Sequence, residues 1–345
     1  MDQITPSLSA LLDLFSPCFR FEVAATFRLM VVAWIVCLGR RTISRVWETT
    51  GRSADGSPYP AFRLFSAAVW NWDEVCRILM AQLLAALVPG TRVWLVIDDT
   101  LCHKRGARVA FGGIFLDAVL SSKRHKAFRF GTNWVTLGLI VELPFRQDRF
   151  FCVNVLWRLY AKKDKDNPAG HRTKPQLALG MVLVVASWLP GRQLLVVGDR
   201  AYIGKHLLKG LPAEVAALGP IHWKAELTEP LPGGPCGRRK KGDKLTTPKQ
   251  AMADDRWPWE DLLLRHPKGE KELRVKVVRP CCWSNSAGRR LLQVVLVRDP
   301  DGQWRDEALL CSDLDLSAQE VVLGYLRRWS VEPAYCDAKQ LLGFH

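Results

Sequence analysis

The sequence lacks the features that mark membrane-spanning and disulfide-bonded secreted proteins. Its longest uncharged apolar run, Leu29 to Gly39, is shorter than the ~20 residues that span a bilayer, so this run predicts a buried helix. A charged segment followed by an apolar core, which a signal peptide requires, is not found at the N-terminus. None of the ten cysteines forms a Cys-x-x-Cys pair, which excludes the commonest zinc and dithiol redox motifs. We therefore expect reduced, mostly buried thiols in a cytoplasmic protein without a membrane partner.

Acidic residues are also scarce. The 345 residues include 34 Asp and Glu against 49 Lys and Arg, a formal net charge of +15. This excess favours a polyanionic partner, because bound Lys and Arg side chains displace counterions from a phosphate backbone. A solvated basic surface and an acidic membrane surface are the other interpretations. Apolar residues make up 48% of the chain, so a large core is expected, in about two folding units at ~150 residues each.

The hydrophobic periodicity of residues 1–90 is helical. Short helices on either side of a turn, with arginines around them, predict one of two structures. One is a DNA-binding unit of the helix-turn-helix kind, and the other is a plain helical bundle with arginines on its solvated face. The arginines concerned are Arg40, Arg41, Arg45, Arg52 and Arg63.

From residue 91 to residue 221 the pattern alternates between strands and helices. Continuous apolar runs indicate buried strands, and a longer run after Thr173, a capping residue, indicates a helix. The predicted order is strand 93–97, strand 108–116, strand 134–143, helix 173–189, strand 194–197, helix 203–211 and strand 215–221.

Residues 222–316 interrupt this order and predict a β-rich insertion. A loop rich in Pro, Gly, Lys and Arg comes first, followed by strand-like runs at 273–282, 291–297 and 307–310. The segment 317–345 is helical again. Ser317 and Glu320 form a capping box, a second helix beginning at Ser330 places Pro333 in its first turn, and Gly343 ends that helix.

Three carboxylates stand out by position. Asp98 and Asp199 each follow a buried apolar strand, and open sheets place their sites at the carboxyl ends of such strands. Glu332 falls in the first turn of the last helix. Each alone has an ordinary structural interpretation, as a turn former or as an acid at a helix N-terminus. Together they supply the hard oxygen ligands that suit Mg²⁺ or Mn²⁺.

The spacing around Glu332 carries a resemblance. Tyr325, Arg328, Glu332 and Lys339 fit the pattern Y-x2-R-x3-E-x6-K, which is the signature of a large branch of insertion-sequence transposases of the DDE superfamily. Ile97-Asp98-Asp99-Thr100 is similar to the first motif of that family, and Gly198-Asp199-Arg200-Ala201-Tyr202 to its second.

The resemblance implies a fold, a reaction and partners. The fold is α/β, with a ribonuclease H-like catalytic core (91–221 and 317–345), a β-rich insertion subdomain (222–316) and an α-helical N-terminal domain (1–90). The reaction is cleavage and joining of phosphodiester bonds at the ends of an insertion sequence by two metal ions, Mg²⁺ or alternatively Mn²⁺. The partners are double-stranded DNA with terminal inverted repeats and a second copy of the chain on paired ends, at the nucleoid.

The resemblance also assigns roles to residues. Asp98, Asp199 and Glu332 become the catalytic metal ligands, with Asp99 as the alternate to Asp98. Tyr325, Arg328 and Lys339 become contacts to DNA phosphates. The chain ends 13 residues after Glu332, whereas relatives usually continue with further helices. A truncated copy, or a catalytically inactive DNA-binding protein that occupies element ends, is therefore the alternative.

Dense basic runs in loops are consistent with DNA as the partner. Arg238, Arg239, Lys240 and Lys241 are predicted to clamp a DNA backbone, against the alternative of a solvated loop. Two further basic loops cover residues 123–126 and the stretch from Lys162 to Lys174.

Overall fold

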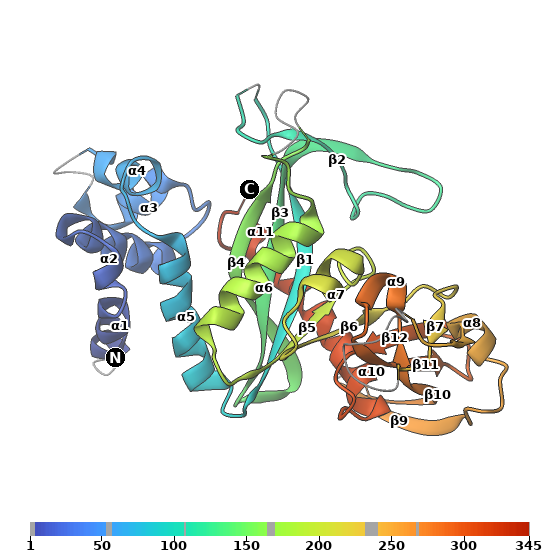
Figure 1. Cartoon of the computed structure of the whole chain (residues 1–345). Helices are drawn as coiled ribbons and strands as arrows, with labels where there is room; N and C mark the ends of the chain where they lie inside the picture. Colours follow the sequence, from blue (N-terminus) through green and yellow to red (C-terminus); the bar gives the residue numbers. More distant parts are fainter. Residues whose placement is uncertain are drawn as a thin grey trace. The chain divides into compact units, whose positions relative to one another are not determined.

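The computed structural model describes residues 4–52, 57–106, 108–163, 170–231, 241–266 and 269–344. The chain divides into two compact units (Figure 1). The first comprises Met1–Ala86 with Glu332–His345, and the second comprises Leu87–Val331.

The described part of the first unit is helical, as the periodicity predicted. Asn71 caps the helix Trp72–Leu87, because its Oδ1 accepts hydrogen bonds from the backbone N–H groups of Asp73 and Glu74 at 2.9 and 3.4 Å. The elements are α1 (Ile4–Asp13), η1 (Ser16–Cys18), α2 (Phe21–Val36), α3 (Ile43–Thr49), α4 (Tyr59–Ser66), α5 (Trp72–Leu87) and α11 (Val331–Gln340).

The core of this unit lies between α2, α3 and α4, around Met30, Trp47 and Leu64. The prediction that residues 29–39 form a buried helix was only half right. The helix α2 ends at Val36, and although Met30 is buried, Ile35 is 60% exposed. The run is apolar on all sides of the helix, so hydrophobicity alone did not show that only one face would be covered.

The C-terminal helix α11 ends at Gln340, three residues before Gly343, where the sequence predicted its end. Gly343 has φ of +77°, a conformation that costs glycine little. The backbone N–H of Phe344 then donates to the carbonyl of Ala338 over 2.9 Å, so the turn at Gly343 folds the end of the chain back onto the last turn of α11.

A single mixed sheet, with twelve strands among the described residues, organises the second unit. Its order is β2-β3-β1-β5-β6-β12-β11-β10-β7-β8, with β4 paired to β3 and β9 paired to β10. The first part of the sheet contains β1 (Arg92–His103), β2 (Gly113–Leu116), β3 (Phe128–Leu143), β4 (Arg146–Tyr160), β5 (Gln193–Gly198) and β6 (Val215–Pro220).

The order β4-β3-β1-β5-β6 forms the centre of the unit. The strands β1, β5 and β6 are parallel, and β3 is antiparallel to β1. The connections run through α6 (Lys174–Trp188) and α7 (Lys205–Gly210), and α6 packs against β3 and β4 (Figure 1). This mixed α/β arrangement is consistent with the ribonuclease H-like fold that the resemblance implied.

One strand of this centre was missed in the sequence. No element was predicted over residues 146–160, yet β4 occupies all of them, while the predicted strand 108–116 is reduced to the four residues of β2. The strand β4 pairs with β3 at the margin of the sheet and carries Arg146, Arg149 and Arg158 among its apolar residues. A strand at the margin of a sheet can carry charged side chains that face solvent. The arginines interrupt the apolar run from which a buried strand would have been predicted.

The strands of residues 222–316 extend the same sheet, because β12 pairs antiparallel with β6. Strands were expected at 273–282, 291–297 and 307–310, and all three are present, but β9 was not foreseen. The elements are β7 (Leu227–Thr228), β8 (Lys244–Thr246), α8 (Pro248–Ala251), β9 (Glu260–His266), β10 (Gly269–Cys282), α9 (Ser284–Ala287), β11 (Leu291–Arg298) and β12 (Glu307–Cys311).

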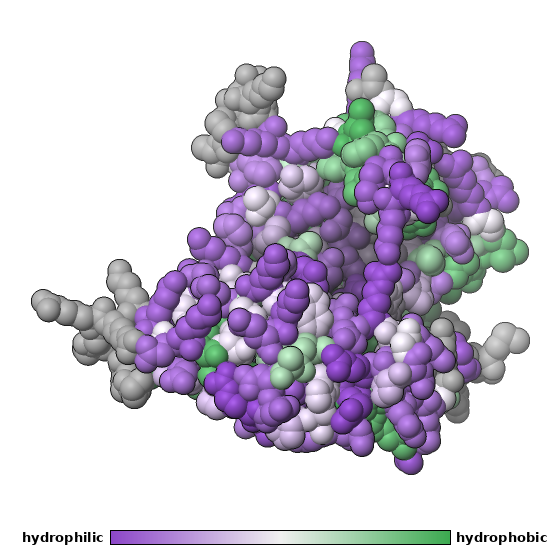
Figure 2. All heavy atoms as spheres, turned by 90° about the vertical axis from the view of Figure 1, so that its right-hand side faces the viewer, coloured by the Kyte–Doolittle hydropathy of each residue, from purple (hydrophilic) through white to green (hydrophobic). Residues whose placement is uncertain are grey.

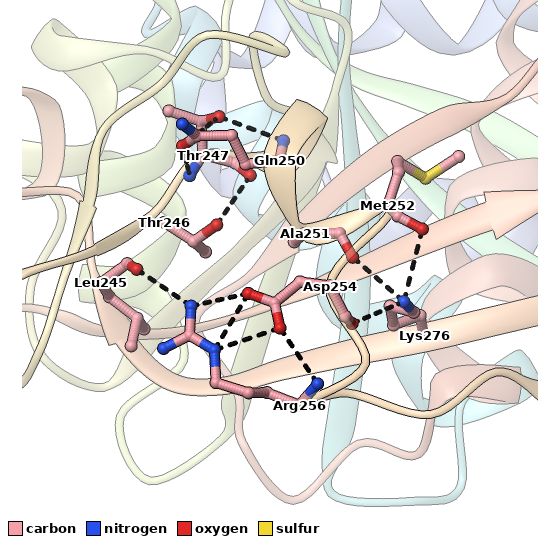
Figure 3. A network of polar contacts seen from close by, with 9 residues as sticks. All are labelled: Leu245, Thr246, Thr247, Gln250, Ala251, Met252, Asp254, Arg256 and Lys276. Carbon is pink, nitrogen blue, oxygen red and sulfur yellow. Dashed lines mark hydrogen bonds and ion pairs between the residues drawn. The ribbon is translucent and has the colours of Figure 1, made fainter.

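A buried lysine attaches α8 and the turn after it to this sheet (Figure 3). Lys276 on β10 is 2% exposed, and its Nζ donates to the carbonyl oxygens of Ala251, Met252 and Asp254 at 3.1, 3.3 and 2.8 Å. The three bonds match the three donors of an ammonium group, so the charge is buried without an unpaired donor.

The helix α10 (Ala318–Arg327) and the 3₁₀ turn η4 (Arg328–Ser330) complete the unit. Both predicted caps are present. Thr173 and Gln176 form a capping box at α6, and Ser317 and Glu320 form one at α10. The cap at Ser317 fixes where α10 begins, and therefore which of its residues face the sheet.

Candidate active site

Two predicted carboxylates lie together at the edge of the sheet where β5 ends. The strands β1 and β5 are parallel, and Ile97 pairs with Gly198. Asp98 therefore lies beside Asp199, which directly follows β5, whereas β1 continues past Asp98 to His103. Asp199 begins a turn in which its Oδ1 accepts from the backbone N–H groups of Ala201 and Tyr202 at 2.9 and 3.3 Å. The two carboxylates are close enough that the negative charge of Asp199 contributes to raising the pKa of Asp98.

The neighbours Asp98 and Asp99 point to opposite faces of β1, as successive residues of a strand must. Asp99 faces α6, where its Oδ2 lies 2.6 Å from Nζ of Lys174 and its Oδ1 accepts from the hydroxyl of Tyr202 over 2.6 Å. The Asp99 carboxylate is therefore held by a cation and a phenol on the face away from Asp98.

The Asp98 carboxylate lies on the face that α10 covers. Its Oδ1 accepts from the backbone N–H of Asp99 over 2.8 Å, and its Oδ2 accepts from Nη1 of Arg328 over 3.3 Å. Burial raises the pKa of Asp98 to about 7, although the Asp99 N–H and the Arg328 charge oppose the rise. The position therefore favours a positive charge beside Asp98 whenever the group is ionised.

Arg328 and Tyr325 lie together on this face. The Cζ atom of Arg328 is 5.6 Å from the centroid of the Tyr325 ring, and the Arg328 side chain is 9% exposed. Burial raises the pKa of Tyr325, so its phenol is neutral near pH 7 and can donate a hydrogen bond to a phosphate oxygen.

The adjacent Arg327 has a different role. Its Cζ lies 4.6 Å from the centroid of Trp94 and 4.3 Å from that of Phe150, and its Nη2 is 3.7 Å from Oε1 of Glu142. These ring and ion-pair contacts attach the end of α10 to β1, β3 and β4, which positions Arg328.

Close packing brings α10 onto this face. A Cβ added to Gly324 would lie 2.4 Å from Cζ3 of Trp94 and 2.9 Å from Cδ2 of Leu218. Trp94 is four residues before Asp98 on β1 and so shares its face. The absence of a side chain at position 324 therefore sets the distance between α10 and the strand that carries Asp98.

Glu332 and Lys339 lie on α11, in the first unit, whereas Asp98, Asp199, Tyr325 and Arg328 lie in the second. Glu332 is exposed and Lys339 is half-buried. Of the predicted basic clamp, Lys241 is exposed and its Nζ donates to Oδ1 of Asn285 over 2.8 Å. Arg238, Arg239 and Lys240 lie outside the described residues.

The contacts of Lys174 and Tyr202 with Asp99 could not be deduced from the sequence. Both residues stand in predicted motifs, Lys174 at the start of a helix and Tyr202 after Asp199. Their contact with Asp99 spans 75 and 103 positions, and no local pattern encodes a pairing at that separation.

The donors at this edge suit a divalent metal ion. Asp98 and Asp199 offer hard carboxylate oxygens of the kind that bind Mg²⁺ or Mn²⁺. Burial raises the pKa of Asp98, and a bound metal ion would favour its charged form. Across the described ranges, no group of three or more His, Cys, Asp or Glu side chains lies close enough together to hold a metal ion.

A family model described as DDE superfamily endonuclease matches residues 14–286. The chain belongs to this family. The match includes Asp98 and Asp199 and ends before the segment from Tyr325 to Lys339. No curated protein matches the chain.

Membership implies a metal-dependent nuclease of the DDE superfamily, with DNA as its substrate. The family suggests transposase or nuclease activity, in agreement with the resemblance seen in the motifs around Asp98 and Asp199. Among the described helices, none combines the length and the hydrophobicity needed to cross a bilayer.

Proposed function

We propose that this DDE endonuclease is a DNA transposase that cuts and joins strands at the ends of an insertion sequence. The observation that carries the proposal is the convergence of Asp98, in the middle of β1, and Asp199, directly after the parallel strand β5, near Arg328 and Tyr325. An anionic pair next to a cation and a neutral phenol suits a phosphodiester, whose phosphate needs both metal ions and hydrogen-bond donors.

We propose Asp98, Asp199 and Glu332 as the catalytic metal ligands, with Mg²⁺ as the metal. Asp98 is preferred to Asp99 because Lys174 and Tyr202 already engage both oxygens of Asp99 on the other face. Glu332 follows Arg328 by four residues, which can span at most about 14 Å of chain. When bound, the metal ions would activate the attacking hydroxyl or water and stabilise the leaving oxygen.

The side chains around these ligands would orient DNA. Arg328 offers several N–H donors in a planar fork that matches a phosphate, and Tyr325 offers one more. Lys339 and the run from Arg238 to Lys241 are proposed as further phosphate contacts. Bound phosphate would compete with Asp98 for the Arg328 guanidinium, which would free the carboxylate oxygen for a metal ion.

The proposed organisation follows the sequence. Residues 91–221 and 317–345 form the catalytic core, 222–316 the insertion subdomain, and 1–90 a helical DNA-binding domain. The substrate would be DNA with terminal inverted repeats, and two copies of the chain would act on paired ends.

The test is cleavage of a plasmid that carries the inverted repeats flanking the gene. With Mg²⁺ or Mn²⁺ the parent protein should nick this DNA, and Asp98→Asn and Asp199→Asn should abolish nicking while retaining DNA binding. Asp261→Asn is the matched control, because the Asp261 side chain is 90% exposed on β9. Nicking by Asp199→Asn at the parental rate would disprove the metal-site assignment.

A second function is a catalytically inactive DNA-binding protein that occupies element ends. The ion pair between Arg328 and Asp98 favours it, because a cation already neutralises one proposed ligand. Binding to the ends without cleavage in either metal would support this function, and parental cleavage would exclude it.

A further inference from the structure

A two-stranded ribbon at the margin of the sheet has an exposed apolar face. The ribbon consists of β2 and the beginning of β3, where Ile114 pairs with Phe130 and Leu116 pairs with Phe128. Paired residues, and residues two apart along a strand, share a face. These four side chains therefore form one surface, and they are 60, 37, 46 and 57% exposed, in the order named above.

The opposite face of the ribbon is fixed to the body of the unit. Phe115 is 8% exposed, and its ring lies edge-on to Tyr160 with centroids 6.1 Å apart. The Nζ atom of Lys162 lies 4.9 Å from the centroid of the Phe115 ring and donates to the carbonyl of Ile114. The ribbon is thus held with its apolar face outward. Figure 2 shows apolar atoms beside hydrophilic ones at the top of the visible face, at the height of β2 in Figure 1.

The chain that leads into and out of the ribbon is strongly basic. Residues 101–133 contain seven Lys and Arg against one acidic residue, Asp117. The Asp117 side chain is 5% exposed, lies 2.6 Å from Nε2 of His103, and accepts from the backbone N–H groups of Val119 and Leu120. The Asp117 carboxylate is therefore buried and occupied by these local hydrogen bonds, and it does not offset the positive charge on the surface. The cations are Lys104, Arg105, Arg108, Lys123, Arg124, Lys126 and Arg129.

The positive charge around the ribbon distinguishes between two possible binding partners for its apolar face, a second copy of the chain and a polyanion. A second copy that added its β2 antiparallel to this β2 would bring two sets of basic connections together, and like charges would oppose the pairing. A polyanion complements them. A two-stranded ribbon fits the DNA major groove, about 12 Å wide, where apolar side chains contact thymine methyl groups.

We propose that the β2–β3 ribbon enters the major groove of the substrate DNA. Ile114, Leu116, Phe128 and Phe130 face the bases, and the cations at 123–126 contact the phosphates beside the groove. The ribbon begins where Gly131 of β3 pairs with His103 of β1. His103 lies five residues after Asp98, roughly 16 Å along the strand, which is the length of about five base pairs. The proposal depends on DNA being the substrate and does not depend on cleavage at Asp98.

The test measures binding of the full chain to a labelled duplex of about three helical turns, in EDTA so that cleavage plays no part. Fluorescence anisotropy gives Kd from about 50 to about 200 mM salt. Lys123→Gln/Lys126→Gln should lower the slope of log Kd against log salt by about 1.8, since each lost phosphate contact removes about 0.9. Arg265→Gln/Arg274→Gln removes the same charge from β9 and β10 and should leave the slope unchanged.

The apolar face has its own variant, Ile114→Ser/Phe130→Ser. It should weaken binding at least about fivefold at every salt concentration, without changing the slope. A slope that falls equally in the basic variant and in its control would overturn the proposal. So would an apolar variant that binds DNA normally but changes from dimer to monomer in sedimentation, since the face would then bind protein. Neither result depends on whether Asp98→Asn still cuts.

Discussion

Arg328 donates from Nη1 to Oδ2 of Asp98 over 3.3 Å, joining residues 230 positions apart. This contact places the segment after α10 on the same face of β1 as the Asp98 side chain. The Asp99 side chain points to the opposite face, which α6 covers. Two adjacent carboxylates thereby acquire different surroundings. Asp98 has a single guanidinium and a raised pKa, whereas both oxygens of Asp99 are engaged by Lys174 and Tyr202.

The two aspartates should therefore respond differently to the same substitution. Asp99→Asn removes the charge that pairs with Lys174 and should lower the free energy of unfolding by about 1–3 kcal/mol. Asp98→Asn removes a carboxylate whose ionisation burial opposes, so the change should stay within about 1 kcal/mol while cleavage is lost. Urea denaturation and plasmid nicking measure the two effects. Equal loss of stability in both variants would contradict the assignment of the faces.

Gly324 should be the most sensitive small residue of α10. Gly324→Ala would press a methyl group against the Trp94 ring, and we expect a loss of about 1–3 kcal/mol together with weaker cleavage, because Arg328 moves with the helix. Gly180→Ala on α6 is the control. Nothing lies within 4 Å of its added Cβ, so it should raise stability by about 0.5–1 kcal/mol. Thermal melts of both variants compare them directly, and a stabilised Gly324→Ala would show that α10 does not pack as described.

Lys276 should contribute mainly to the stability of the segment around α8. Lys276→Met removes the buried ammonium group that donates to the three carbonyl oxygens (Figure 3), and the expected loss is roughly 2–4 kcal/mol. Lys249→Met, at an exposed position of α8, should change stability little. Chemical denaturation gives both values, and proteolysis near residue 252 reports local opening. If both variants lowered the free energy of unfolding by a similarly small amount, the three hydrogen bonds of Lys276 would not contribute to stability as proposed.

Protonation of Asp117 at low pH should destabilise the turn that follows β2 and lower the Tm. Burial alone would raise the pKa of Asp117, but hydrogen bonds from the Leu120 N–H, His103 and the Val119 N–H together lower it. A lowered folded-state pKa gives stability that is present above about pH 4 and is lost as the pH falls through the folded value. Asp117→Asn should therefore flatten the fall in Tm below about pH 4, whereas Asp261→Asn should leave it unchanged. Parallel acid profiles for the parent and Asp117→Asn would contradict the prediction.

The parts of the fold that depend on neighbouring residues could be predicted. The apolar runs before Asp98 and Asp199 are strands, and the capping boxes at Thr173 and Ser317 form as expected. What could not be predicted depends on contacts between distant segments. Val93, Leu95, Val96 and Ile97 are all buried, so β1 has no alternation from which the face of Asp98 could be deduced. The contacts of Asp99 with Lys174 and Tyr202 could not be predicted either. They form only when α6 and the turn after β5 pack against β1.

The contrast between Arg327 and Arg328 has a consequence for insertions and deletions. Arg327 lies between the rings of Trp94 and Phe150, while Arg328 reaches Asp98. One residue inserted between the cap at Ser317 and this pair would rotate everything after it by about 100° and bring Arg327 to the place of Arg328. In a library of single-codon insertions, α10 should therefore accept none, even at positions where nearly any substitution is harmless.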